Sequence, residues 1–145
     1  MSVIGLTSLD IRPISADKVV KKSSKSFRKF RNHLVDGNQV KAAYAFCELC
    51  FDLKIAFASK NTYPENVKDA IDSAEAFQYV TDCVSESKLM LEKSVSEKYG
   101  QLVNVDFAKK ISDEIFYSNI TKKKIIKKID TALKVGVRDV KKKRQ

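Results

Sequence analysis

Apolar residues recur every three or four positions along most of the chain, which is the spacing of a helix with one buried face. The pattern predicts helices over about 16–36, 39–60, 63–99, 105–117 and 122–140. The segment 39–60 is apolar on nearly every side, which predicts a central position. The stripe weakens near Ser85–Ser87, so 63–99 is expected to form one long helix or two helices joined by a kink. We therefore expect an all-α bundle of four to five helices with short connections.

Residues typical of helix ends mark most of these boundaries. Ser15 precedes the first helix as an N-cap, and Gly37 follows it where a left-handed residue commonly ends a helix. Thr62 and Glu65 have the spacing of a capping box for the next long segment. Thr121 is placed to cap the last helix.

The chain divides into an arm, a helical domain and a tail. Residues 1–14 alternate apolar and polar side chains and contain Pro13, so we expect an extended N-terminal arm that folds back or docks on a neighbouring subunit. Residues 15–140 are predicted to form the helical bundle domain. Residues 141–145 read KKKRQ, which predicts a basic, disordered C-terminal tail. The run Lys141–Arg144 also resembles a short nuclear-localisation signal.

Composition narrows the class of protein. A chain of 145 residues with 43% hydrophobic residues is long enough for one domain with a modest core. Three cysteines do not suggest a disulfide framework, and no stretch approaches the roughly 20 apolar residues of a membrane span. The first 15 residues lack the basic and apolar regions of a signal peptide. We expect an intracellular, cytoplasmic protein, with the nucleus as an alternative through Lys141–Arg144.

The net charge of +10 is distributed unevenly along the chain. Residues 1–34 contain 8 basic and 2 acidic side chains, a net charge of +6. Residues 35–118 contain 9 basic and 14 acidic side chains, a net charge of −5. Residues 119–145 contain 11 basic and 2 acidic side chains, a net charge of +9. Two basic ends around an acidic middle favour either a polyanionic partner or head-to-tail self-association.

The basic residues gather on one side of the first and last predicted helices when each is drawn at 100° per residue. The predicted inner face of the first helix comprises Val20, Phe27, Phe30 and Leu34. The predicted inner stripe of the last helix comprises Ile126, Ile129, Leu133, Val137 and Val140. The predicted nucleic-acid-binding residues on the outer faces are Lys18, Lys21, Lys22, Lys25, Arg28 and Lys29 in the first helix and Lys124, Lys127, Lys128, Lys134 and Arg138 in the last.

These outer faces favour an anionic partner over solvation alone. No acidic residue occurs between 18 and 35, and only Asp130 borders the second face, so like charges repel along both. Nucleic acid, bound through its phosphate backbone without sequence preference, is the predicted partner. RNA is slightly favoured over DNA. The candidate base-stacking side chains are Tyr63, Tyr79 and Tyr117.

The charge polarity leaves a second class of function open, a protein–protein interaction module whose basic ends contact the acidic middles of its own copies. A homo-oligomer is expected in either case. No motif for a small-molecule substrate or a cofactor occurs. By analogy of fold, small basic helical proteins with an N-terminal arm include viral and phage coat, packaging and silencing-suppressor proteins.

Arg28 and His33 match the R-x4-H pattern of HEPN-type ribonucleases, and the sequence RNHLVDG resembles the RN-x-LVHG form of that motif with Asp36 in place of its histidine. The resemblance implies a dimeric helical ribonuclease that uses Arg28 and His33. On an ideal helix, however, these two residues lie about 140° apart. The motif also stands early in this chain, whereas in that family it usually lies late in the domain. We therefore retain a ribonuclease as a second alternative and expect a protein that is not an enzyme.

Cys47 and Cys50 form a C-x-x-C pair, and Cys83 and His33 complete a possible set of four zinc ligands. The pair lies in the middle of the most apolar predicted helix, and a redox C-x-x-C occurs instead at a helix N-terminus, which lowers the thiol pKa. Cysteine also packs in cores as a small hydrophobic residue. We expect core packing for all three thiols, and therefore no metal site.

Overall fold

The structure, a computed structural model, confirms the all-α fold. It describes residues 16–62, 67–99 and 106–144, and within these ranges the side chains other than those of 59–62, 67–70, 99 and 134–144. The described part of the chain contains five helices and no strand. They are α2 (Ala16–Val35), α3 (Gln39–Thr62), α4 (Val67–Tyr99), α5 (Phe107–Tyr117) and α6 (Lys122–Arg144).

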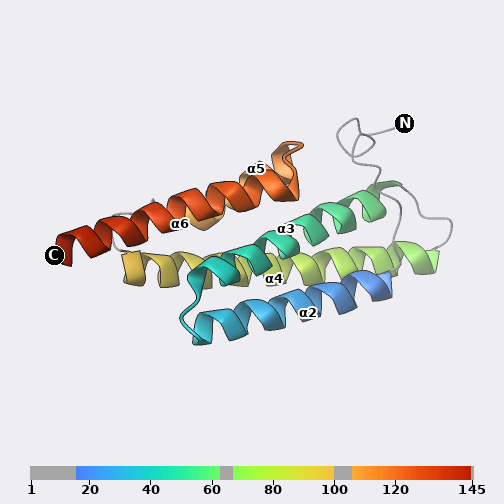
Figure 1. Cartoon of the computed structure of the whole chain (residues 1–145). Coiled ribbons are helices and arrows are strands. Elements are labelled where there is room, and N and C mark those ends of the chain that lie inside the picture. The colour runs from blue at the N-terminus through green and yellow to red at the C-terminus, as the bar shows by residue number, and fades with distance from the viewer. Residues whose placement is uncertain (1–15, 63–66, 100–105, 145) are drawn as a thin grey trace.

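Helix α3 occupies the centre, as its apolar sequence predicted. It packs against α2, α4, α5 and α6, and α4 also contacts all the other helices. In Figure 1, α3 passes between α2 on one side and the α5–α6 pair on the other, while α4 runs the length of the bundle. The two basic helices, α2 and α6, run in the same direction on the two sides of α3. Helix α3, which contacts both of them, carries the acidic residues Glu48 and Asp52.

The buried face of α2 differs from the predicted one. Its buried residues are Val19, Ser23, Ser26 and Phe30, whereas Val20, Phe27 and Leu34 are only half-buried. The prediction omitted Ser23 and Ser26, because hydrophobicity alone defined the inner face. Both hydroxyls donate hydrogen bonds to carboxylates of α3, so polar contacts rather than apolar side chains fill this part of the interface.

The buried stripe of α6 confirms Ile129 and Leu133 but begins one residue earlier than predicted. Ile125, Ile129 and Leu133 are buried, and Ile126 is only half-buried. These three residues follow a strict i, i+4, i+8 row, the ridge that commonly packs into the groove of a neighbouring helix. The predicted stripe residues Val137 and Val140 lie outside the described side chains.

The turn between α2 and α3 is closed at Gly37, as predicted, with φ +76°. The Gly37 amide donates to the Leu34 carbonyl at 3.0 Å, and the Asn38 amide donates to the His33 carbonyl at 2.8 Å. These two bonds form a Schellman motif. Asn38 then caps α3, because its side-chain oxygen accepts the Lys41 amide at 3.0 Å. The short connection fixes α2 antiparallel to α3.

Other predicted boundaries can be compared with the structure. Thr121 caps α6 by accepting the Lys124 amide at 3.2 Å, which confirms that cap. α4 is one continuous helix through Ser85–Ser87, which settles the open choice between one helix and two. α6 continues through residues 141–144, where the sequence predicted a disordered tail. Ser15, Glu65 and the arm over 1–14 lie outside the described residues, and Thr62 is the last residue of α3.

The short helix α5 is held at both ends by charged side chains from other helices. At its start, a Glu92 oxygen of α4 accepts the backbone amides of Ala108 and Lys109. Beyond its end, Lys54 of α3 donates to the carbonyls of Ile115 and Ser118 at 3.0 and 2.7 Å. A negative carboxylate near the N-terminus and a positive ammonium group near the C-terminus both interact favourably with the helix dipole, so they stabilise α5. Burial lowers the pKa of the Lys54 ammonium group, which donates to these two carbonyl oxygens.

Candidate nucleic-acid interface

The outer face of α2 is solvent-exposed over its whole length. All six predicted residues, Lys18, Lys21, Lys22, Lys25, Arg28 and Lys29, are exposed. Arg31 is a further exposed cation, which the prediction omitted, and its guanidinium lies 4.6 Å from the centre of the Phe27 ring. The half-buried phenyl ring is therefore covered by a charged group, a favourable cation–π arrangement.

Most of the cations on this face have no acidic partner among the described residues. Lys22 forms an ion pair with Asp52 of α3, at 3.2 Å. Among the described residues, Lys21, Lys25, Arg28 and Lys29 have no acidic partner. Four unpaired cations therefore lie within about two turns of one helix, where like charges repel.

The basic residues of α6 are more often paired. Lys128 contacts Glu114 of α5 at 2.5 Å, and Lys122 contacts Glu48 of α3 at 3.4 Å. Lys124 and Lys127 are exposed and have no acidic partner among the described residues. The predicted site residues Lys134 and Arg138 lie outside the described side chains.

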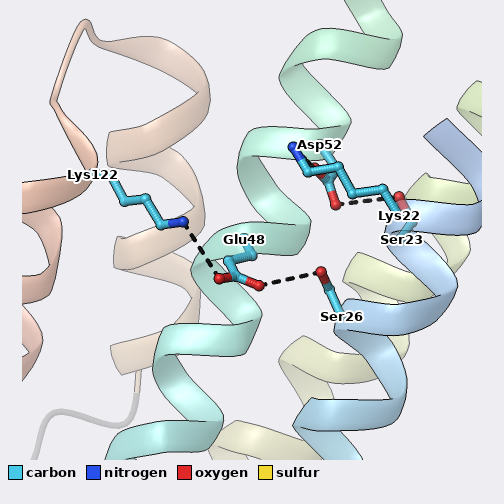
Figure 2. A network of polar contacts seen from close by, with 6 residues as sticks. All are labelled: Lys22, Ser23, Ser26, Glu48, Asp52 and Lys122. Atoms are coloured by element: carbon cyan, nitrogen blue, oxygen red, sulfur yellow. Dashed lines mark hydrogen bonds and ion pairs between the residues drawn. The ribbon is translucent and has the colours of Figure 1, made fainter. Parts of the chain in front are cut away.

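The two basic helices meet at a pocket of about 220 Å³. Its lining residues are Lys22, Lys25, Ser26 and Lys29 of α2, Glu48, Phe51 and Asp52 of α3, and Lys122 of α6. Figure 2 shows Glu48 between the two sides, accepting from Ser26 at 3.3 Å on one oxygen and from Lys122 at 3.4 Å on the other. We call these eight residues the α2–α6 pocket.

Lys122 belongs to the pocket although the sequence did not select it. On the wheel of the last helix it falls near the predicted inner face, where a lysine is not expected. The available signal was the Thr121 cap, which places Lys122 in the first turn of α6. What no pattern showed is that the partner of Lys122 is a glutamate 74 residues earlier in the chain.

The carboxylate of Asp52 is the most buried charged group of the pocket, with 2% of the residue exposed. Burial raises its pKa above the ordinary value, while Lys22 and the hydroxyl of Ser23 beside it act in the opposite direction. Ser23 donates to one oxygen at 3.4 Å, and Lys22 lies 3.2 Å from the other. Asp52 thus holds Lys22 against the wall of the pocket (Figure 2).

The residues of the ribonuclease-like motif lie on a regular stretch of α2. Arg28 is exposed and His33 is half-buried, and the His33 carbonyl accepts a hydrogen bond from the turn that follows the helix. The helix is unbroken between the two residues, so their separation of about 140° around the axis remains.

The three cysteines are buried, as core packing requires. Burial raises the pKa of the Cys47 thiol to about 12 and also raises that of Cys50 and Cys83. Within the described residues, no group of three or more histidine, cysteine, aspartate or glutamate side chains is placed to hold a metal ion.

Two of the predicted stacking tyrosines can be located. Tyr79 is half-buried, and its hydroxyl lies 2.6 Å from that of Ser24 in α2, so it packs in an interhelical contact. Tyr117 is 80% exposed at the end of α5. Tyr63 lies outside the described residues.

The comparisons with known proteins identify no relative of this chain. None of the family models, curated proteins or solved structures compared with this chain matches it. None of the described helices is both long enough and apolar enough for a membrane crossing.

Proposed function

We propose that this protein binds nucleic acid through the phosphate backbone, without sequence preference, and that α2 provides the principal contact surface. The observation that carries the proposal is a set of four exposed cations that have no acidic partner among the described residues: Lys21, Lys25, Arg28 and Lys29. Fixed lysine and arginine side chains on a helix face are the groups that neutralise phosphates and release counterions.

The energetics of α2 support this proposal. Like charges one turn apart destabilise a helix by a few tenths of a kcal/mol per pair. On α2 the i, i+4 pairs Lys18–Lys22, Lys21–Lys25 and Lys25–Lys29 are all basic, and α3 offsets this repulsion with a carboxylate at Lys22. A bound polyanion removes the remaining repulsion between these lysines, so the basic face of α2 is electrostatically more stable in a complex than in the free protein.

A binding assay with a matched control tests the proposal. The variant Lys21→Glu/Arg28→Glu reverses two cations that lie outside the α2–α6 pocket. The control Lys93→Glu/Lys110→Glu makes the same change of charge at exposed residues of α4 and α5. Duplex RNA, single-stranded RNA and duplex DNA carrying a fluorophore are titrated at low salt and followed by anisotropy.

The expected result is binding by the wild type that is tighter at low salt than the roughly 1–100 µM range of non-specific complexes at physiological salt. The α2 variant binds about tenfold more weakly or worse, whereas the control loses little. A higher affinity for RNA than for DNA would support the preference for RNA. Equal losses in the two variants would show that only the net charge matters, and no binding at all would refute the proposal.

A second candidate function is self-assembly through opposite charges. It is favoured by the exposed face of α4, where Glu75, Asp82 and Glu86 lie within about 40° of one another around the helix. In this account the basic face of α2 contacts the acidic face of α4 in another copy. Sedimentation of nucleic-acid-free protein distinguishes the two, because self-assembly requires oligomers that dissociate as salt is added.

A further inference from the structure

The α2–α6 pocket has a shape that the backbone-binding surface of α2 does not share. Three helices bound it, and its volume of about 220 Å³ is enough for one small group rather than for a duplex. A phosphodiester inside a strand has a covalent neighbour on both sides, so it enters such a pocket only if the strand bends sharply. A phosphate at the end of a strand has one covalent neighbour and meets no such constraint.

The charges that line the pocket have a definite balance. Lys22, Lys25, Lys29 and Lys122 contribute four positive charges, and Glu48 and Asp52 contribute two negative ones when ionised. The remaining charge is therefore +2. Two of the ammonium groups are engaged by the carboxylates, Lys22 by Asp52 and Lys122 by Glu48.

The other two ammonium groups are available to a ligand. Lys25 and Lys29 lie one turn apart on the same side of α2, about 6 Å along the helix axis, with no acidic partner among the described residues. The two carboxylates hold Lys22 and Lys122 in defined positions around them, so the site is organised before a ligand arrives (Figure 2). Such pre-organisation lowers the cost of ordering side chains on binding.

We infer that the α2–α6 pocket binds the terminal phosphate monoester of a nucleic-acid strand. This inference rests on the proposed function and adds to it a preference for strand ends. A phosphate monoester carries a charge of about −1.5 to −2 at neutral pH. That charge matches the remaining +2 of the pocket, whereas a backbone diester carries only one negative charge.

Phe51 gives the pocket an apolar part beside the cations. It is half-buried on α3 and lines the same space as Lys25 and Lys29. An aromatic ring next to a phosphate site offers a surface to the sugar or base of the terminal nucleotide, which stacks on aromatic side chains without sequence preference. Inorganic phosphate has no group for this surface, so it binds more weakly than a phosphorylated strand end.

The test compares strands that differ only at their ends. A short single-stranded RNA with an internal fluorophore is prepared with hydroxyls at both ends, with a 5′-phosphate or with a 3′-phosphate. The variant Lys25→Gln/Lys29→Gln removes the two unpaired pocket cations, and Lys93→Gln/Lys110→Gln is the control at exposed sites elsewhere. Circular dichroism verifies that each variant is folded, and unlabelled inorganic phosphate serves as a competitor.

The expected result is that one terminal phosphate tightens binding by about fivefold to tenfold over the hydroxyl-ended strand. The pocket variant loses this preference, the control keeps it, and inorganic phosphate competes only at high concentration. Equal affinity for phosphorylated and hydroxyl-ended strands would overturn this inference and leave the proposed function standing. Failure of every strand to bind would refute both. If the preference persists in Lys25→Gln/Lys29→Gln, the terminal phosphate binds elsewhere and the pocket is excluded.

Discussion

The two basic helices share one sequence pattern but differ in how far the protein neutralises them. In α2, Lys22 pairs with Asp52, and four cations of the same face have no acidic partner among the described residues. In α6, Lys122 and Lys128 are both paired, with carboxylates of α3 and α5. The difference arises because Glu48 and Glu114 lie within reach of lysines of α6, whereas Asp52 is paired with the outer face of α2 only at Lys22.

The comparison shows that the number of basic residues in a segment is a poor guide to how many of them lack an acidic partner. The last 27 residues have the larger net charge, +9 against +6 for residues 1–34. Pairing with Glu48 and Glu114 nevertheless reduces the charge that the described part of α6 offers to a partner. We therefore expect α2 to contribute more to binding than the described part of α6.

The largest expected effect comes from reversing unpaired cations in the two helices separately. Lys21→Glu/Arg28→Glu in α2 should weaken RNA binding about tenfold or more, and Lys124→Glu/Lys127→Glu in α6 only about threefold, because carboxylates already lower the potential around α6. Fluorescence anisotropy at low salt measures both. A larger loss in the α6 variant would reverse the comparison.

A smaller effect concerns how the helices are anchored. Gly37→Ala should destabilise the protein by about 1–2 kcal/mol, because φ +76° disfavours any residue with a Cβ even though no atom lies within 4 Å of the added group. Thr121→Ala should cost about 1 kcal/mol through loss of the α6 cap. Chemical denaturation measures both, and RNA affinity of the folded variants should not change. Loss of affinity in Gly37→Ala would indicate that the end of α2 takes part in binding.

The sequence predicted the exposed half of each basic helix better than the buried half. The six exposed positions of α2 follow from helical spacing alone, since charged side chains avoid the core. Ser23 and Ser26 were missed because their burial depends on Asp52 and Glu48, which lie 29 and 22 residues away in sequence. Lys122 was missed for the same reason. Polar contacts between helices leave no periodic signal in a single sequence.

The pairing that distinguishes α6 can be removed directly. Glu114→Gln should strengthen RNA binding by about twofold, because it frees Lys128. Asp113→Asn is the matched control, since it makes the same change of charge on α5 but frees Lys109 instead. The affinity gain should be larger in Glu114→Gln. Equal gains would mean that net charge, and not the position of the freed lysine, determines affinity.

The smallest effect concerns the buried carboxylate between the helices. Because burial raises the pKa of Asp52, the folded state binds a proton more tightly than the unfolded state. The contribution of Asp52 to stability therefore falls as pH rises from about 4, the unfolded value, through the higher folded value. Asp52→Asn should flatten the decline in this window when the free energy of unfolding is measured against pH. An unchanged slope would show that Lys22 fully offsets the effect of burial.

The central claim is that phosphates bind to cations fixed on folded α2, and the salt dependence of binding tests it most directly. The logarithm of the RNA association constant is measured against the logarithm of salt concentration for the wild type, for Lys21→Gln/Arg28→Gln and for a chain without residues 141–145. Each lost phosphate contact reduces the slope by about 0.7–0.9, so the double variant should lose about 1.4–1.8. The truncated chain should retain most of its affinity. An unchanged slope in the double variant, together with loss of binding in the truncated chain, would contradict the account.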